Sequence, residues 1–453
     1  MTFPRPASVP SVLTGLAALV LLVLAPGCDL VELDDRPNPN GLALEDLLDE
    51  PTRPRISNAA VGIETSARTG LGTYLVDVGV LGREYWRVSP SEPRFTSDLL
   101  GKSSSTLNNN TFYITTPWAA SYGTIRNANT MIVALDLNET LSAEEKAGAR
   151  GFAQTWIAYQ YLLNLNLTFD GGVRFIEPGD DEAGPLRGYD ESLDRIAALF
   201  DEAAGNLESG GAAFFFPTSI GRGVPSTPAG YLQINRALAA RVDAYSEDWQ
   251  GVLDALDDSF VDADGDLEAG AYHVFSNATG DVQNPLFFPL GGGGDGLLAH
   301  PSFVADIAED DDRISKVEER PAARTFDGLT SGFDVDRYET PTTPVPIVRN
   351  AELILLRAEA NAQLGDTGAA INDINVIRNS ATLGDYDGGE DGDSLIDEIL
   401  RQRRFELYAE GHRWLDLRRY DRLDTLPIDR EGDDVFDRFP VPESETNDPN
   451  ANA

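Results

Sequence analysis

The chain has 453 residues, of which 42% are hydrophobic, and its 75 acidic against 35 basic side chains give a formal net charge of −40. So acidic a surface repels phosphate, which excludes nucleic acid as a partner. A single cysteine excludes an intrachain disulfide, and three scattered histidines without a His/Cys cluster argue against a zinc or redox-metal site. With only three lysines, the dense carboxylate coat suggests a salty habitat, in which screening removes the self-repulsion.

The N-terminus has the pattern of an export signal. Arg5 precedes an apolar run over residues 12–25 that is too short for a comfortable membrane span. The run ends in Ala25-Pro26-Gly27-Cys28, which resembles the lipobox of bacterial lipoproteins, where cleavage before the cysteine frees it for lipid attachment. We expect a signal peptide over 1–27 and a lipid on Cys28, with an ordinary secretory signal as the alternative. The acidic, proline-rich residues 28–54 are expected to form a tether.

Helical spacing dominates most of the chain beyond the tether. Loose periodicity over residues 56–81 precedes stretches predicted as helices at 118–135, from Ser142 on, 189–207, 228–245, 249–256, 347–364 and 367–379. Ser142 with Glu145 forms a capping box. Alanine-rich, aromatic pairs of this size resemble tetratricopeptide hairpins, one of them joined at Gly365-Asp366. By contrast, residues 83–112 and 260–345 have the composition of loops.

The most informative stretch covers residues 395–420. Apolar residues recur there at steps of three and four, and Arg403 falls inside their stripe. Because an unpaired buried charge costs several kcal/mol, we predict Glu406, Glu410 and Asp416 as its partners. Gly411 interrupts the helical run, and the chain is expected to turn so that Trp414 packs back on the same core.

The run from Gln402 to Leu417 resembles the C-terminal signature of the SusD/RagB family, an Arg-rich, Glu-Leu, Glu-Gly-x-Arg-Trp, Asp-Leu series. The matching residues are Arg403, Glu406, Glu410, Gly411, Arg413, Trp414 and Asp416. The family usually carries Glu where this chain has Gln402, whose amide is expected to accept a hydrogen bond from an arginine instead. The segment from Tyr122 to Asn129 and a helix over 150–169 that ends near Gly171-Gly172 extend the resemblance to the N-terminal half.

The resemblance implies a mainly α fold, an α-α superhelix of tetratricopeptide-like hairpins with a loop-rich, irregular second half. It implies a helical-repeat region over 55–260, a RagB/SusD region over 261–445 and a tail over 446–453. It further implies a non-enzymatic lipoprotein on the outside of the outer membrane that captures oligosaccharides, or alternatively peptides, for a SusC-like TonB-dependent transporter. A tetratricopeptide-type adapter and a surface hydrolase are the rival interpretations, although no catalytic motif or dinucleotide fingerprint supports an enzyme or a cofactor.

Sugar binding requires flat apolar faces and planar polar groups. Between residues 83 and 113, aromatic side chains are interleaved with Arg, Asp and Asn outside helical periodicity. We therefore predict ligand contacts from Arg83, Tyr85, Trp86, Asp98, Asn108 and Tyr113, in a cluster that also contains Arg87, Phe95, Asn109 and Phe112. The acidic run from Asp262 to Glu268 lacks the EF-hand layout and is expected to be a solvated turn, with a calcium site as the alternative.

Overall fold

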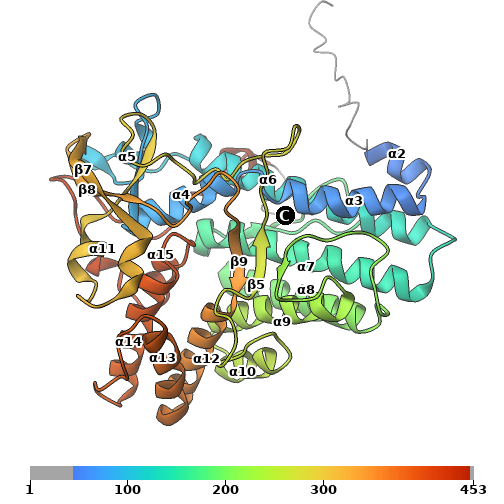
Figure 1. Cartoon of the computed structure of the whole chain (residues 1–453). Coiled ribbons are helices and arrows are strands. Elements are labelled where there is room, and N and C mark those ends of the chain that lie inside the picture. The colour runs from blue at the N-terminus through green and yellow to red at the C-terminus, as the bar shows by residue number, and fades with distance from the viewer. Residues whose placement is uncertain (1–43, 449–453) are drawn as a thin grey trace, which may run out of the picture. The chain divides into compact units, whose positions relative to one another are not determined.

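Helices form most of the regular structure, as predicted (Figure 1). The computed structural model describes residues 44–448, so the predicted signal peptide, Cys28 and most of the tether lie outside the described residues. From Leu44 on, the chain forms one unit, and the predicted regional boundary near residue 260 falls inside it, between α10 and β5. Along residues 44–448, no helix combines the length and apolarity that crossing a membrane requires.

The first half is a stack of helices in which neighbours along the chain pack on one another. Its long members are α6 (Phe112–Leu137), α7 (Ala143–Thr168), α8 (Tyr189–Glu208) and α9 (Pro228–Tyr245), and α7 packs on both α6 and α8 (Figure 1). The shorter helices are α2 (Leu44–Asp49), α3 (Arg53–Ser66), α4 (Leu71–Leu81), α5 (Arg94–Ser97) and α10 (Trp249–Asp257).

Two of these helices begin where the sequence predicted. The Ser142 hydroxyl accepts from the Glu145 amide at 3.1 Å, and the Glu145 carboxylate accepts from the Ser142 amide at 3.0 Å, which confirms the capping box of α7. At α9, Thr227 accepts from the Gly230 amide at 3.2 Å and Pro228 occupies the first turn. Both ends satisfy backbone donors that have no partner inside the helix.

The second half contains a further helical layer formed by α12 (Asn350–Leu364), α13 (Thr367–Ser380) and α14 (Gly392–Glu406). The predicted α12–α13 hairpin is confirmed: Gly365 adopts φ +84°, and the Asp366 side chain accepts from the Ala369 amide at 3.1 Å. Apolar residues of all three helices, among them Ala358, Ile374 and Ile399, form one buried cluster. The chain then continues through α15 (Arg413–Arg419) and ends its described part after α16 (Glu443–Thr446).

The regions predicted as loops contain all four strands of one small antiparallel sheet and strand β5 of another, which corrects the prediction. The first sheet has the strand order β1-β6-β8-β7 and consists of Tyr85–Val88, Gly296–Ala299, Leu329–Val335 and Val317–Phe326. A second has the order β4-β5-β9, with Gly221–Arg222, Gly270–His273 and Val345–Arg349, and a third pairs β2 (Val173–Arg174) with β3 (Leu186–Arg187). A strand as short as β1 depends on β6, a partner distant in sequence, so local composition does not reveal it, whereas β7 and β8 are consecutive strands that pair directly.

Short elements connect these parts. They are α11 (Pro301–Asp306) and the 3₁₀ turns η1 (Lys102–Ser104), η2 (Phe169–Gly171), η3 (Asp312–Lys316) and η4 (Leu423–Thr425).

Candidate functional site

The predicted burial of Arg403 in the C-terminal signature is confirmed. Its side chain lies inside the molecule, and its Nε donates to the Asp416 carboxylate at 2.7 Å. Asp416 reaches it because α15 folds back after Gly411, which adopts φ +89°. Trp414 is fully buried and donates from its indole nitrogen to the Phe436 carbonyl at 2.9 Å, so the expected return of the chain to the same core is also confirmed.

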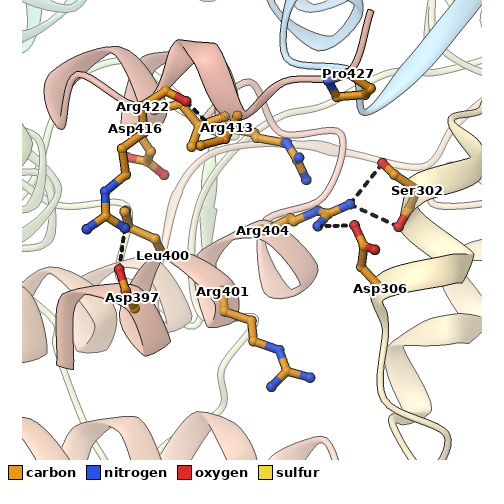
Figure 2. Close-up of a pocket in the computed structure, with 12 residues that line it drawn as sticks. Ser302, Asp306, Asp397, Leu400, Arg401, Arg404, Arg413, Asp416, Arg422 and Pro427 are labelled. Atoms are coloured by element: carbon orange, nitrogen blue, oxygen red, sulfur yellow. Dashed lines mark hydrogen bonds and ion pairs between the residues drawn. The ribbon is translucent and has the colours of Figure 1, made fainter. Parts of the chain in front are cut away.

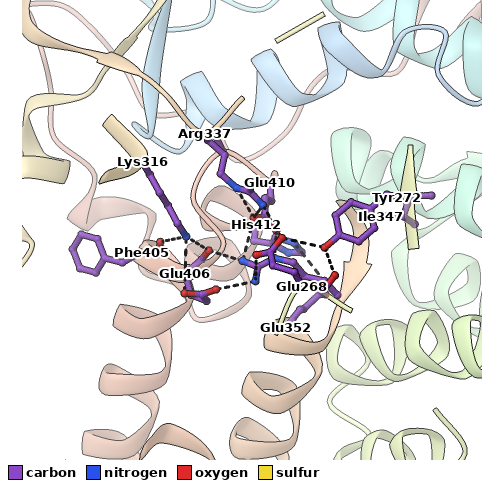
Figure 3. A network of polar contacts seen from close by, with 12 residues as sticks. Glu268, Tyr272, Lys316, Arg337, Ile347, Glu352, Phe405, Glu406, Glu410 and His412 are labelled. Atoms are coloured by element: carbon purple, nitrogen blue, oxygen red, sulfur yellow. Dashed lines mark hydrogen bonds and ion pairs between the residues drawn. The ribbon is translucent and has the colours of Figure 1, made fainter. Parts of the chain in front are cut away.

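Glu406 and Glu410 do not pair with Arg403, and that part of the prediction is wrong. Their partner is Arg349 at the end of β9, which donates to Glu406 at 2.8 Å and to Glu410 at 2.9 Å. Arg337 reaches Glu410 at 3.1 Å (Figure 3). Burial alone would raise the pKa of Glu410, but the guanidinium groups of Arg349 and Arg337 lower it to about 2. The network therefore fastens β9 to the end of α14.

Gln402 also departs from its expected role. Its side-chain amide donates to the Glu398 carboxylate at 2.7 Å, and its carbonyl oxygen is buried without a hydrogen-bond donor among the residues described. The signature is thus an architectural device: it joins α14, α15 and β9 through buried ion pairs and presents none of these paired groups to a ligand.

The structure divides the predicted ligand-binding cluster into a buried layer and an outer layer. Arg83, Tyr85, Trp86 and Tyr113 are each at most 3% exposed. The Tyr85 hydroxyl donates to the Leu75 carbonyl at 2.8 Å, the Trp86 indole donates to Asp429 at 3.0 Å, and Arg83 donates to the Asp434 carbonyl at 2.7 Å. These four side chains pack and fasten the segment, so their faces do not offer a platform in this structure.

The outer layer consists of half-buried phenylalanines and the arginines that lie over them. We call Arg87, Arg94, Phe95, Phe112 and Phe288 the aromatic–arginine surface. The Phe95 and Phe112 rings meet edge to face at 5.0 Å, the Arg87 guanidinium lies 4.4 Å from the Phe288 ring centre, and that of Arg94 lies 4.8 Å from the Phe112 ring centre. Sequence reasoning missed Phe288, which follows β5 far along the chain and shows its role only through the fold.

The two remaining predicted residues border this surface. Asp98 is half-buried and accepts from the Ser97 hydroxyl at 2.8 Å. Asn108 is exposed. Its backbone amide donates to the Tyr113 hydroxyl at 2.6 Å, and its side-chain oxygen accepts from the Asn110 backbone amide at 2.8 Å. Both side chains are therefore engaged by contacts within residues 97–113.

Carboxylate groups pair with the two arginines of the aromatic–arginine surface. Arg87 contacts Asp295 at 2.9 Å, and Arg94 contacts Glu92 at 2.6 Å. Guanidinium groups held over rings in this way retain N–H groups for hydrogen bonding, while the rings supply an apolar face. Flat apolar faces beside planar polar groups are the chemistry that a sugar ring requires.

The acidic turn at residues 262–268 is occupied by contacts within the chain. Asp262 accepts from the Asp264 amide at 3.0 Å, Asp266 accepts from the Glu268 amide at 2.9 Å, and the Glu268 carboxylate contacts Arg349 at 3.3 Å. Within residues 44–448, no group of three or more His, Cys, Asp or Glu side chains is arranged to hold a metal ion.

Comparison with known proteins shows what the C-terminal part of the chain resembles in sequence. The SusD family model matches residues 326–451. "SusD-like protein P38" of Formosa agariphila is 43% identical over 88 residues, and the match spans 18% of this chain and 18% of that relative.

Solved structures resemble a much larger part of the chain. A SusD superfamily protein from Bacteroides vulgatus, 16% identical, superposes with a TM-score of 0.66 over 87% of this chain and 97% of that one. NanU of B. fragilis, 17% identical, superposes with a TM-score of 0.65 over 92% of this chain and 98% of that one. Surface glycan-binding protein A from Bacteroides uniformis, 16% identical, superposes with a TM-score of 0.61 over 82% of this chain and 88% of that one. Residues 326–451 thus match the SusD family, and the mainly α fold of the chain resembles that of solved SusD superfamily proteins.

Proposed function

We propose that the protein binds oligosaccharides at the aromatic–arginine surface, with Asp98 and Asn108 as bordering polar contacts. The observation that carries this proposal is the set of half-buried rings from α5, the start of α6 and the segment before β6, each with a guanidinium group over it. The structural likeness to a protein described as a surface glycan-binding protein, and to a putative sugar-binding protein from B. vulgatus, supports the same ligand class.

The proposal includes a place in the cell. A lipid on Cys28 holds the protein on the outer face of the outer membrane, where it delivers captured oligosaccharides to a SusC-like TonB-dependent transporter without turning them over. A helical scaffold that holds binding residues on β1, α5, the start of α6 and the segment before β6 suits capture. Purification of the native protein from membranes tests the partnership: a large barrel protein is expected to accompany it, and its absence would remove the transporter from the proposal.

The binding site is tested by affinity electrophoresis through gels that contain polysaccharides, neutral and acidic. Phe112→Ala is expected to reduce retardation, because a ring contact is worth about 1 kcal/mol, or roughly fivefold in Kd. Phe215→Ala is the matched control, since Phe215 is also a half-buried ring under an arginine, with the Arg53 guanidinium 5.1 Å from its centre. Equal retardation of the wild type and Phe112→Ala would move the site elsewhere. Product release from the same panel would favour a hydrolase.

A further inference from the structure

A cavity of about 440 Å³ lies between α11, α14 and α15 and shares no residue with the aromatic–arginine surface. Four guanidinium groups line it, those of Arg401, Arg404, Arg413 and Arg422, and we call it the arginine cavity. Figure 2 shows the end of Arg404 turned toward Ser302 and Asp306, and Arg401 extending away from the other labelled side chains. Such a concentration of cations stands out in a chain with a net charge of −40.

Partners within the protein already engage each carboxylate of the cavity wall. Asp306 accepts from Arg404 at 2.8 Å, and Asp397 pairs with Arg422 (Figure 2). Asp416 is held by two arginines from outside the cavity lining, Arg403 at 2.7 Å and Arg419 at 3.1 Å. The wall therefore has no carboxylate left to neutralise its other two arginines.

Arg413 has no partner among the described residues, and the partner of Arg401 is distant. The carboxylate that Arg401 meets is Glu398, at 4.0 Å, and Glu398 also pairs with Arg378. Arg413 has neither an ion pair nor a hydrogen bond to any residue of the described chain, and its Nε is buried without an acceptor. A guanidinium group stays charged in a protein and offers five donors in a planar fork. Arg413 therefore lacks the acceptors that an anion would supply, and Arg401 has donors free to join it.

The remaining wall is apolar, with a few hydroxyl groups. Leu400, Leu417 and Pro427 form the apolar part, and Ser302 and Thr425 contribute hydroxyls. Pockets of about 300–1,000 Å³ hold small ligands, and an apolar wall opposite a charged fork suits a ring that carries an anionic substituent.

We propose that the arginine cavity binds the carboxylate or sulfate group of an acidic saccharide unit. Arg401 and Arg413 supply the charge-assisted hydrogen bonds, and the apolar wall covers the C–H side of the ring. The inference rests on the proposed function for the saccharide part of the ligand, whereas the requirement for an anion follows from Arg413, which has no partner among the described residues, and from Arg401, whose carboxylate partner is distant.

The test is calorimetric titration of the full chain with D-glucuronate, N-acetylglucosamine 6-sulfate, D-glucose and inorganic sulfate at low ionic strength. At least one acidic sugar is expected to bind and glucose is not. Arg413→Gln and Arg401→Gln should each weaken that binding roughly tenfold, because charge-assisted hydrogen bonds are about twice as strong as neutral ones. Arg222→Gln, which removes an exposed arginine whose nearest carboxylates lie 4.0 Å away, should leave it unchanged.

Each other outcome overturns the inference. No binding of either acidic sugar, binding of inorganic sulfate alone, or equal loss in Arg222→Gln would all do so. Arg401 is 44% exposed in its side chain, so Arg401→Gln keeps the test valid if Arg413→Gln fails to fold, as circular dichroism would show. Retardation of the same variants by neutral polysaccharide in the gel separates the two proposals. Arg401→Gln should be retarded as strongly as the wild type. If only Phe112→Ala loses retardation, the aromatic–arginine surface remains the proposed site even if the cavity binds nothing.

Discussion

At the scale of single residues, Glu84 is a buried carboxyl group whose ionised form the fold does not stabilise. It is 3% exposed, one carboxylate oxygen accepts from the Ala409 amide at 2.9 Å, and the other has no partner among the residues described. Burial raises the pKa of Glu84 to about 8. The side chain is thus protonated in the folded protein at neutral pH, while the unfolded chain ionises it near its ordinary value of 4.5.

This difference predicts a pH dependence with a definite sign. Between about pH 4.5 and 8 the folded state holds a proton that the unfolded state has lost, so the contribution of Glu84 to stability falls as pH rises. Glu84→Gln, which mimics the protonated form, should therefore melt at a higher temperature than the wild type at pH 8 and at the same temperature at pH 4. Calorimetry at the two pH values measures both melting temperatures. A difference between Glu84→Gln and the wild type that is equal at pH 4 and pH 8 would contradict the raised pKa of Glu84.

At the scale of elements, sequence patterns predicted those parts whose determinants are local. Helix α9 has the predicted bounds, and the capping box fixed the start of α7. Strand β1 was missed because four residues acquire a strand conformation only by pairing with β6, some two hundred residues away. The partner of Glu406 and Glu410 was missed for the same reason, since Arg349 arrives from β9 and no helical spacing points to it. Burial of the aromatic cluster likewise depended on its tertiary neighbours.

Two glycines show how differently elements tolerate a methyl group. Gly172 adopts φ +70° between η2 and β2, and a Cβ there would lie 1.7 Å from the Arg187 carbonyl oxygen on the paired strand β3. Gly62 lies inside α3, and no atom comes within 4 Å of the corresponding position. Gly172→Ala should therefore lower the free energy of unfolding by about 2 kcal/mol or more. Gly62→Ala should raise it by about 0.5–1 kcal/mol through helix propensity.

Urea denaturation of the two variants measures these changes. Because both substitutions add one methyl group to a glycine, their opposite signs isolate the effect of backbone conformation and of the space around it. A Gly172→Ala variant as stable as the wild type would show that the turn between α7 and β2 is not fixed in the conformation described here.

At the scale of the whole molecule, the helical stack and the buried ion pairs stabilise different parts of the fold. The stack of α6 to α9 and the α12–α14 layer supply the core, while Arg349 and Arg403 fasten the return of the chain at α15. The residues that we assign to ligands lie outside these paired groups, on the aromatic–arginine surface and in the arginine cavity. The fold that the chain shares with SusD superfamily structures therefore positions both proposed sites, and the side chains at these sites carry the proposed specificity.

The net charge of −40 predicts how the molecule responds to salt. The buried side chains of the described residues include seven arginines and eleven acids, so the interior accounts for only a small part of the excess. The rest repels itself across the surface, and that repulsion weakens as the Debye length falls from about 30 Å at 0.01 M to about 3 Å at 1 M ionic strength. The melting temperature should therefore rise with sodium chloride over this range. A neutral osmolyte at matched osmolality is the control for effects other than screening, and full stability in dilute buffer with no gain from salt would refute the inferred adaptation to a salty medium.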